Sequence, residues 1–195
     1  MKPKQITKLR TELGLSFDEF AALSRGHTVV PVYRRLVADA LTPVSAFAAV
    51  REPGGAFLFE SVVGGERVAR YSMLGVRPRA RITGDLHTIR LVHADGRSEV
   101  LPGDPFSAVR AYHRRFRVAP VAGLPRFTGG LVGYWSYDTV RAAEPLPDCP
   151  PDPLGLPDVQ LMHCDTVLVF DHSFNHLLLI GHLDLSEGRS VADEF

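Results

Sequence analysis

The glycine-rich segment PRFTGGLVGYWSYDTVR, residues 125–141, restricts the fold more than any other part of the chain. Its glycines are Gly129, Gly130 and Gly133. Glycine removes the side chain where a backbone passes close to a neighbour or turns sharply, and the aromatic residues that follow supply large rings with polar edges. The segment therefore predicts a bent, closely packed strand. Asp138 follows these rings, where its carboxylate is expected to cap a helix running through Arg141.

Composition is that of a globular domain with one core. The chain has 195 residues, of which 45% are hydrophobic, enough to bury one substantial core. Its 22 basic and 22 acidic residues cancel, which gives no electrostatic reason to expect nucleic acid or an anionic membrane as a partner. No apolar run approaches the ~20 residues that span a bilayer. The basic opening residues lack an apolar signal core, so a cytoplasmic location is expected.

Hydrophobic periodicity and turn residues predict an α+β fold dominated by antiparallel sheet. Ser16 and Glu19 predict a capping box at the start of a helix, and Thr42-Pro43 and Asp104-Pro105 predict the starts of two more. The Asp95-Gly96 pair predicts a hairpin turn. Strands are predicted at residues 29–33, 56–63, 68–74, 80–84, 87–93, 98–101, 158–170 and 176–184.

Cysteine, histidine and arginine residues suggest no obvious chemistry on their own. Cys149 and Cys164 are too few for a disulfide framework or a zinc site and are expected to be reduced thiols. The histidines do not supply three clearly convergent ligands, so no metal site is predicted. The basic run at residues 113–117 has two interpretations, a site for an acidic partner or an exposed helix end. We favour the exposed helix end.

A second motif, AFLFESVVGGERVARYSMLG at residues 56–75, precedes the glycine-rich segment. Together and in this order, the two motifs resemble the amino-terminal half of anthranilate synthase component I, a chorismate-utilising aminase. The resemblance extends from residue 29 to about residue 182. The same group of enzymes contains the aminodeoxychorismate synthases, so a fragment of component I of that enzyme is an alternative.

The resemblance implies a fold for this chain and places catalysis in a second domain. It implies a mostly antiparallel sheet with outer helices, in one domain with a helical lead-in at residues 1–28 and a sheet-rich core at 29–184. Residues 185–195 would begin the connection to a chorismate-binding domain that the chain lacks. The family's catalytic residues and its magnesium ligands lie in that domain, so no catalytic residue, metal site or cofactor is predicted in this chain, and the chain alone is expected to be inactive.

The resemblance also implies that this half of the enzyme senses tryptophan. Glu60 and Ser61 match the family's LLES-type element, with Phe59 in place of its second leucine, and Arg70 and Tyr71 stand where the family places further contacts. The predicted tryptophan-binding residues are therefore Glu60, Ser61, Arg70 and Tyr71. A carboxylate or hydroxyl oxygen can accept hydrogen bonds from the ammonium group of an amino acid, and a cation can offset its carboxylate. The predicted apolar lining is Leu58, Phe59 and Met73. Without the resemblance, Glu60 and Ser61 would be a polar pair at a strand end.

The glycine-rich segment is predicted to pack this pocket against the catalytic half. Its scaffold residues are Gly129, Gly130, Gly133, Tyr134 and Asp138. The implied partners are tryptophan as inhibitor, the chorismate-binding half, and a glutamine amidotransferase subunit, component II, that delivers ammonia. Two alternatives carry no chemistry: a free-standing amino-acid-binding module, and a structural piece that binds no ligand.

Overall fold

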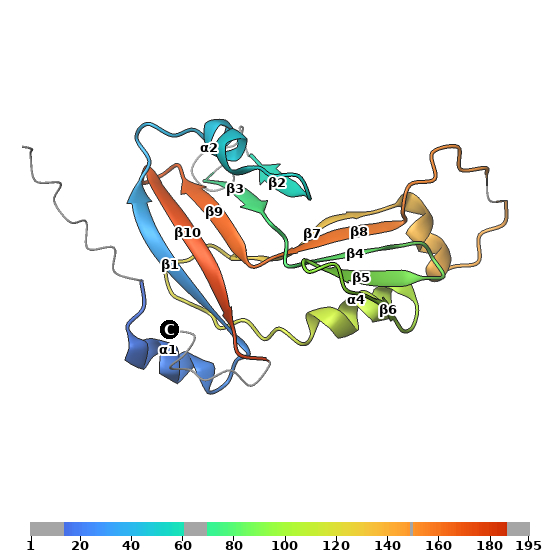
Figure 1. Cartoon of the computed structure of the whole chain (residues 1–195), viewed down its shortest axis with the longest axis horizontal. Coiled ribbons are helices and arrows are strands. Elements are labelled where there is room, and N and C mark those ends of the chain that lie inside the picture. Colours follow the sequence, from blue (N-terminus) through green and yellow to red (C-terminus); the bar gives the residue numbers. More distant parts are fainter. Residues whose placement is uncertain (1–13, 61–69, 149, 187–195) are drawn as a thin grey trace, which may run out of the picture.

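The computed structural model describes residues 14–60, 70–148 and 150–186. In this part of the chain, two five-stranded antiparallel sheets lie side by side along the long axis of the molecule, with helices packed outside them (Figure 1). The arrangement confirms the predicted α+β class with dominant antiparallel sheet.

The first sheet, called sheet A, brings the two ends of the described chain together. It is ordered β1 (Val29–Val37), β10 (His176–Asp184), β9 (Thr166–Asp171), β3 (Tyr71–Val76) and β2 (Ala56–Phe59). The strand predicted at residues 29–33 is longer in the structure, because β1 pairs with β10 along its whole length, from Val29 opposite Asp184 to Val37 opposite His176.

The second sheet, sheet B, is built mainly from neighbouring hairpins. It is ordered β6 (Ser98–Leu101), β5 (Ile89–His93), β4 (Ala80–Gly84), β8 (Val159–Cys164) and β7 (Gly130–Trp135). Asp95-Gly96 forms the predicted turn, in which Gly96 has a φ of +86°. Strand β5 begins two residues later than predicted, because Asp85 accepts hydrogen bonds from the backbone N–H groups of His87 and Thr88 in a turn.

The strand predicted at residues 158–170 is two strands in different sheets. Strand β8 ends at Cys164 and β9 begins at Thr166, so Asp165 alone separates a strand of sheet B from a strand of sheet A. The sequence does not reveal this change of sheet, because apolar residues that pack in the core continue on both sides of Asp165.

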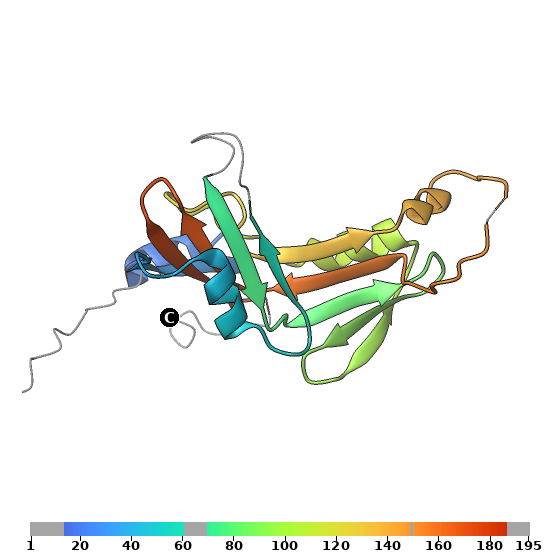
Figure 2. The ribbon, with the colours of Figure 1, turned by 90° about the horizontal axis from the view of Figure 1, so that it is seen from above.

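Three helix starts agree with their predicted caps. In α1 (Phe17–Ser24), Ser16 and Glu19 form the capping box; in α2 (Pro43–Val50), Thr42 caps the first turn; in α4 (Pro105–His113), Asp104 accepts from two backbone N–H groups. These local hydrogen bonds satisfy donors that an isolated helix end leaves unpaired. Figures 1 and 2 show α4 running along one side of sheet B and α2 lying near β2 and β3.

The predicted cap at Asp138 is wrong. The helix after β7 is a 3₁₀ helix, η1 (Tyr137–Ala142), and Ser136 occupies its N-cap position. Asp138 lies inside the first turn and accepts a 2.7 Å hydrogen bond from Arg141 Nε. The Ser136 hydroxyl donates to Asp158 at 2.6 Å and makes no cap bond.

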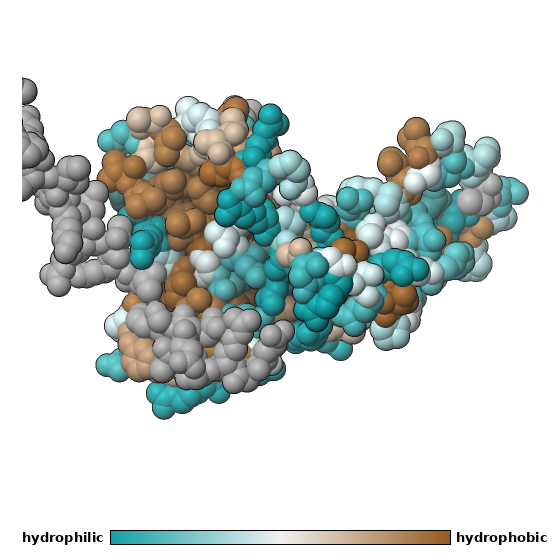
Figure 3. All heavy atoms as spheres, viewed as in Figure 1, coloured by the Kyte–Doolittle hydropathy of each residue, from teal (hydrophilic) through white to brown (hydrophobic). Residues whose placement is uncertain are grey.

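The buried core follows the two sheets. One face of sheet A packs against residues of the 118–132 segment, and the other packs under α2. Sheet B buries a face against α4, in a cluster that includes Ile82, Leu91, Val109, Tyr112 and Leu161. In the view of Figure 3, apolar side chains gather over sheet A, whereas most of the surface over sheet B is hydrophilic.

Candidate functional site

The predicted tryptophan-binding residues lie at one edge of sheet A, at the open ends of β2 and β3. Glu60 is exposed and directly follows β2, and Arg70 directly precedes β3. Ser61 lies outside the described residues. The structure therefore places Glu60, Arg70 and Tyr71 at the neighbouring ends of two adjacent strands, as the sequence motif implied for a hairpin.

Strand alternation separates the predicted apolar lining. Phe59 pairs with Met73, and Leu58 pairs with Leu74. Because successive side chains point to opposite faces of a sheet, Phe59 and Met73 share a face with Tyr71, whereas Leu58 packs on the face that α2 covers. The structure thus brings three of the predicted residues together and turns Leu58 away from them.

Arg70 makes a bidentate ion pair with Asp171. Its Nε donates to Oδ1 at 3.0 Å and its Nη2 to Oδ2 at 2.7 Å. The guanidinium also lies 4.8 Å from the ring centroid of Tyr71 and 5.1 Å from that of Phe174. A planar fork held on both edges in this way is a strong, directional contact, and it balances the positive charge of Arg70.

The surroundings of this ion pair shift the pKa of both its carboxylate and the neighbouring phenol. Burial acts to raise the pKa of Asp171, but the hydrogen bond and charge of Arg70 outweigh it, so the pKa lies below its ordinary value. Burial raises the pKa of Tyr71. Asp171 is therefore ionised and Tyr71 protonated at neutral pH, which keeps the pair and the adjacent ring in one charge state.

The turn between β9 and β10 adds residues that sequence analysis did not assign to this site. Besides Asp171 it supplies His172, whose Nε2 lies 2.8 Å from Ser72 Oγ, and the ring of Phe174. A cavity of about 250 Å³ lies between this turn and the start of α2, on the face of sheet A opposite to Phe59, Tyr71 and Met73. The DHSFN turn is visible in the sequence, but only the β3–β9 register, with Tyr71 opposite Asp171, shows what it contacts.

The glycine-rich segment approaches this region through its first half. The ring of Phe127 lies 6.2 Å from that of Phe57 on β2, edge to face. A Cβ on Gly129 would lie 2.8 Å from the Cys164 carbonyl oxygen, and Gly129 and Gly130 have φ of +142° and +123°. The predicted close approach is confirmed for Gly129, where a side chain would clash with the neighbouring strand, whereas Gly130 has open space around it and serves the backbone conformation alone.

The second half of the segment runs away from the predicted site. A Cβ on Gly133 would lie 1.9 Å from the Gln160 carbonyl oxygen, so this glycine serves packing within sheet B. Tyr134 lies on β7 opposite Gln160 and is 43% exposed. Asp138, in η1, lies at the end of sheet B that is remote from β2 and β3 (Figure 1). The assignment of Tyr134 and Asp138 as scaffold residues of the tryptophan pocket remains a prediction.

A charged cluster at the junction of the two sheets was not expected from sequence. Arg79 Nη1 lies 2.6 Å from Asp184 and 3.4 Å from Asp165. Burial raises the pKa of Asp165 to about 6, although Arg79 acts to lower it. The three residues come from separate segments of the chain, so no local motif reveals them.

Histidines beside this cluster are held neutral. Burial lowers the pKa of His163 to about 3 and that of His182 to about 4. Burial raises the pKa of Tyr112 to about 12, so Tyr112 stays protonated, and its hydroxyl is hydrogen-bonded to His163 Nδ1 at 2.7 Å. His163 Nε2 lies 3.4 Å from Asp165 Oδ1. His182 Nε2 lies 3.0 Å from Thr128 Oγ1.

Within residues 14–60, 70–148 and 150–186, no group of three or more histidine, cysteine or acidic residues is placed to hold a metal ion. Cys164 is a buried free thiol, and Cys149 lies outside the described residues. No helix in the described part of the chain has the length and apolarity needed to cross a membrane.

Curated relatives match most of the chain. It is 40% identical over 179 residues to anthranilate synthase component 1 of Acinetobacter calcoaceticus, covering 88% of this chain and 36% of that protein. It is 41% identical over 161 residues to the Streptomyces coelicolor protein of the same name, covering 82% of this chain and 28% of the relative. The chain belongs to the anthranilate synthase component I family. It spans about a third of the length of these relatives.

A solved structure supports the same family. The fold matches that of anthranilate synthase component I from Streptococcus pneumoniae with a TM-score of 0.50 and 25% sequence identity, covering 80% of this chain and 32% of that one. No protein-family model matches the chain. The two five-stranded sheets thus correspond to part of the anthranilate synthase component I fold.

Proposed function

We propose that the chain is the amino-terminal, tryptophan-sensing part of anthranilate synthase component I. With a chorismate-binding part it would convert chorismate and ammonia, or glutamine, to anthranilate and pyruvate. The observation that carries the proposal is the match of 82–88% of this chain to relatives that bear this name. Because the chain spans only about a third of those relatives, the reaction itself is assigned to the larger protein.

The geometry at β2 and β3 supports an amino-acid ligand. The exposed carboxylate of Glu60 is available to an ammonium group, and Phe59, Tyr71 and Met73 on one face offer apolar contact to an indole. Since Asp171 already engages Arg70, we assign Arg70 the role of fixing the Tyr71 ring and the β9–β10 turn. The ammonium contact would then contribute most to recognition.

Feedback inhibition requires a coupling between this site and the chorismate site. Tryptophan must bind more tightly to an arrangement of the enzyme in which the chorismate site is inactive, since binding alone inhibits nothing. We place magnesium and the catalytic residues in the chorismate-binding part, and the delivery of ammonia in a component II amidotransferase subunit. A cytoplasmic location fits a biosynthetic enzyme of this kind.

Calorimetric titration of the 195-residue chain with tryptophan tests the proposal, with phenylalanine as the competing ligand. We expect saturable heat from tryptophan and none from phenylalanine. Glu60→Ala should weaken tryptophan binding by about tenfold or more, because it removes a charge-assisted hydrogen bond. Ser61→Phe should also weaken it. Glu144→Ala removes an exposed carboxylate outside the site and is the matched control.

A chain that gives no heat is next combined with the remaining part of a relative's component I and titrated again. Tryptophan binding that appears only then would place part of the pocket in the added part. If tryptophan still has no effect on binding or on chorismate turnover, the sensing role is wrong. Restored turnover without tryptophan inhibition would favour the aminodeoxychorismate synthase alternative.

A further inference from the structure

The carboxyl end of α4 carries an unusual concentration of arginine. Its exposed arginines are Arg110, Arg114, Arg115 and Arg117. Within the described part of the chain, no carboxylate lies within ion-pair distance of any of these four guanidinium groups. Favourable contact with the helix dipole explains one or two cations at a helix end, but each such contact is weak. Four exposed cations in eight residues give this end of α4 a strong local positive potential.

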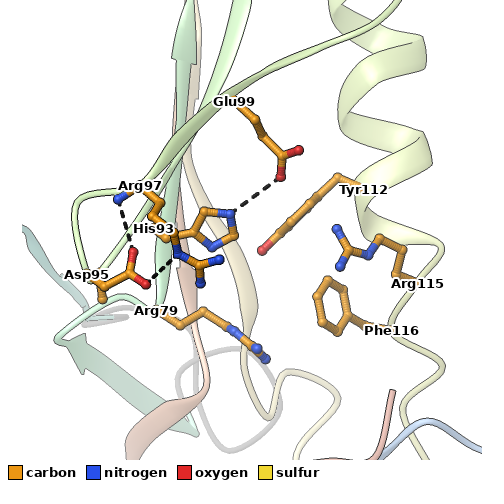
Figure 4. A pocket seen from close by; sticks show the side chains of 9 residues that line it. Arg79, His93, Asp95, Arg97, Glu99, Tyr112, Arg115 and Phe116 are labelled. Carbon is orange, nitrogen blue, oxygen red and sulfur yellow. Dashed lines mark hydrogen bonds and ion pairs between the residues drawn. The ribbon is translucent and has the colours of Figure 1, made fainter. Parts of the chain in front are cut away.

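A cavity of about 470 Å³ adjoins this helix end, between α4 and the β5–β6 hairpin. Three arginines point toward the same space from different segments: Arg79 from the β3–β4 connection, Arg97 from the β5–β6 turn, and Arg115 from the residues after α4 (Figure 4). Guanidinium groups that converge on one cavity suit a ligand with more than one negative charge.

Aromatic rings hold Arg115 in place. Its guanidinium carbon lies 5.6 Å from the ring centroid of Tyr112 and 5.9 Å from that of Phe116. Tyr112 itself is 4% exposed, and its hydroxyl is bonded to His163, so the ring is a fixed support. Stacking orients a guanidinium through its face and leaves its N–H edge to donate hydrogen bonds.

The other two arginines are anchored by carboxylates. Arg79 lies 5.4 Å from the Phe116 ring centroid and uses Nη1 for both Asp165 and Asp184. Arg97 donates from Nε to Asp95 at 2.7 Å. The cavity also contains Glu99, 3.4 Å from His93. Besides His93, the charged side chains of the lining are three arginines and two carboxylates, and Arg115 is the arginine without a carboxylate partner among the described residues.

We propose that this cavity binds a small dianion bearing carboxylate or phosphate groups, with Arg115 as its principal ligand. A bidentate pair with Arg115 would satisfy one anionic group, and Arg79 and Arg97 would approach the other. Arg110 near the end of α4 and Arg114 and Arg117 after it would attract the anion from solution. The site lies on sheet B, far from Glu60 and Tyr71 on sheet A, so it is separate from the proposed tryptophan site.

The convergence of these groups on one cavity favours a small ligand over a macromolecule. The converging groups lie in a cavity, whereas an acidic protein or a nucleic acid would be met by charges spread over an exposed surface. The two rings beside Arg115 are occupied, Tyr112 and Phe116 both packing against His163, and so do not offer a stacking platform for bases.

The test is calorimetric titration of the 195-residue chain at low ionic strength with inorganic phosphate and, separately, with succinate. Chloride at the same ionic strength is the monoanion control. We expect saturable binding of at least one dianion and none of chloride. Phosphate alone would identify a phosphate site, and succinate alone a dicarboxylate site.

Two substitutions that each remove one positive charge decide where the anion binds. Arg115→Gln should lower the association constant by about tenfold or more, because it removes charge-assisted hydrogen bonds. Arg114→Gln, next to it but outside the cavity, should lower it by less than about twofold. Arg115→Lys keeps the charge and should give an intermediate loss, which separates loss of the fork from loss of charge.

The proposal is overturned if neither dianion binds to the folded chain, or if chloride binds equally well. Equal losses from Arg114→Gln and Arg115→Gln also overturn it, because they would indicate a diffuse response of the whole basic surface. Far-ultraviolet circular dichroism of each variant confirms that the fold is intact. Should Arg115→Gln unfold the chain, the comparison between Arg115→Lys and Arg114→Lys decides instead.

Discussion

Arg70 on sheet A and Arg115 beside sheet B show two ways of fixing a guanidinium group. Arg70 is held by a bidentate carboxylate, Asp171, and its charge is balanced within the fold. Arg115 is held by the rings of Tyr112 and Phe116 and retains its charge. An arginine fixed by a carboxylate serves mainly structure, whereas one fixed by aromatic rings keeps its capacity to bind an anion.

The largest effect expected from this comparison is the loss of Asp171. Asp171→Ala leaves the partly exposed Arg70 without its partner and removes the hydrogen bond to the Ser173 N–H, so we expect the free energy of unfolding to fall by about 2 to 3 kcal/mol. Urea unfolding measures the change. The matched control is Asp95→Ala, which breaks the exposed Asp95–Arg97 pair and should cost much less. Equal losses would contradict the distinction between the two sites.

The second largest expected effect is a loss of stability as the pH falls from 7 to 5, caused by the buried histidines at the junction of the two sheets. In the folded chain the pKa values of His163 and His182 lie near 3 and 4, below the ordinary value of 6.5, so the unfolded chain binds more protons as the pH falls from 7 to 5. Asp165, with a pKa raised to about 6, offsets part of this loss by binding a proton in the folded state. The net expectation is a loss of about 2 kcal/mol between pH 7 and pH 5.

The Arg70–Asp171 pair should contribute nothing to that acid response. The lowered pKa of Asp171 means that its stabilisation is present above the ordinary carboxyl pKa and is lost only at lower pH. Urea unfolding at several pH values tests both statements. His163→Asn should reduce the dependence on pH between 7 and 5, and Asp171→Ala should leave it unchanged. A pH dependence that Asp171→Ala abolishes would contradict the assignment of the response to His163 and His182.

The smallest effect should come from Arg115. Arg115→Gln removes only ring contacts, so the free energy of unfolding should fall by less than about 1 kcal/mol. Thermal and urea unfolding of this variant beside Arg70→Gln provide the comparison, and the Arg70 variant should be the less stable. A large destabilisation by Arg115→Gln would mean that Arg115 is a structural residue.

Local hydrogen bonding made parts of the fold predictable. The caps at Ser16, Thr42 and Asp104 and the turn at Asp95-Gly96 all depend on residues within three or four positions of one another. Asp138 was misplaced because the exact start of the helix, one residue after Ser136, decides whether a carboxylate caps it or lies inside its first turn.

Features that depend on distant segments were not predictable. The partner of Arg70 is set by the β3–β9 register, and Arg79 meets Asp165 and Asp184 only where the two sheets adjoin. The sequence motif located Glu60, Arg70 and Tyr71, but strand alternation, which turns Leu58 away from Phe59, required the exact bounds of β2. The arginine-lined cavity is formed by three segments that are distant in sequence. The only part of it that the sequence indicated was the basic run at the end of α4.

Because a single residue separates β8 from β9, the connection between the two sheets cannot take up a change in length. An extra residue inserted beside Asp165 would have to be taken up by sliding one strand along its neighbours, and a slip of one position exchanges buried and exposed side chains along that strand. An insertion of the kind that a long loop such as residues 143–158 can accommodate should therefore prevent folding when it is placed beside Asp165. Through this one residue, the strand register of sheet A is coupled to that of sheet B.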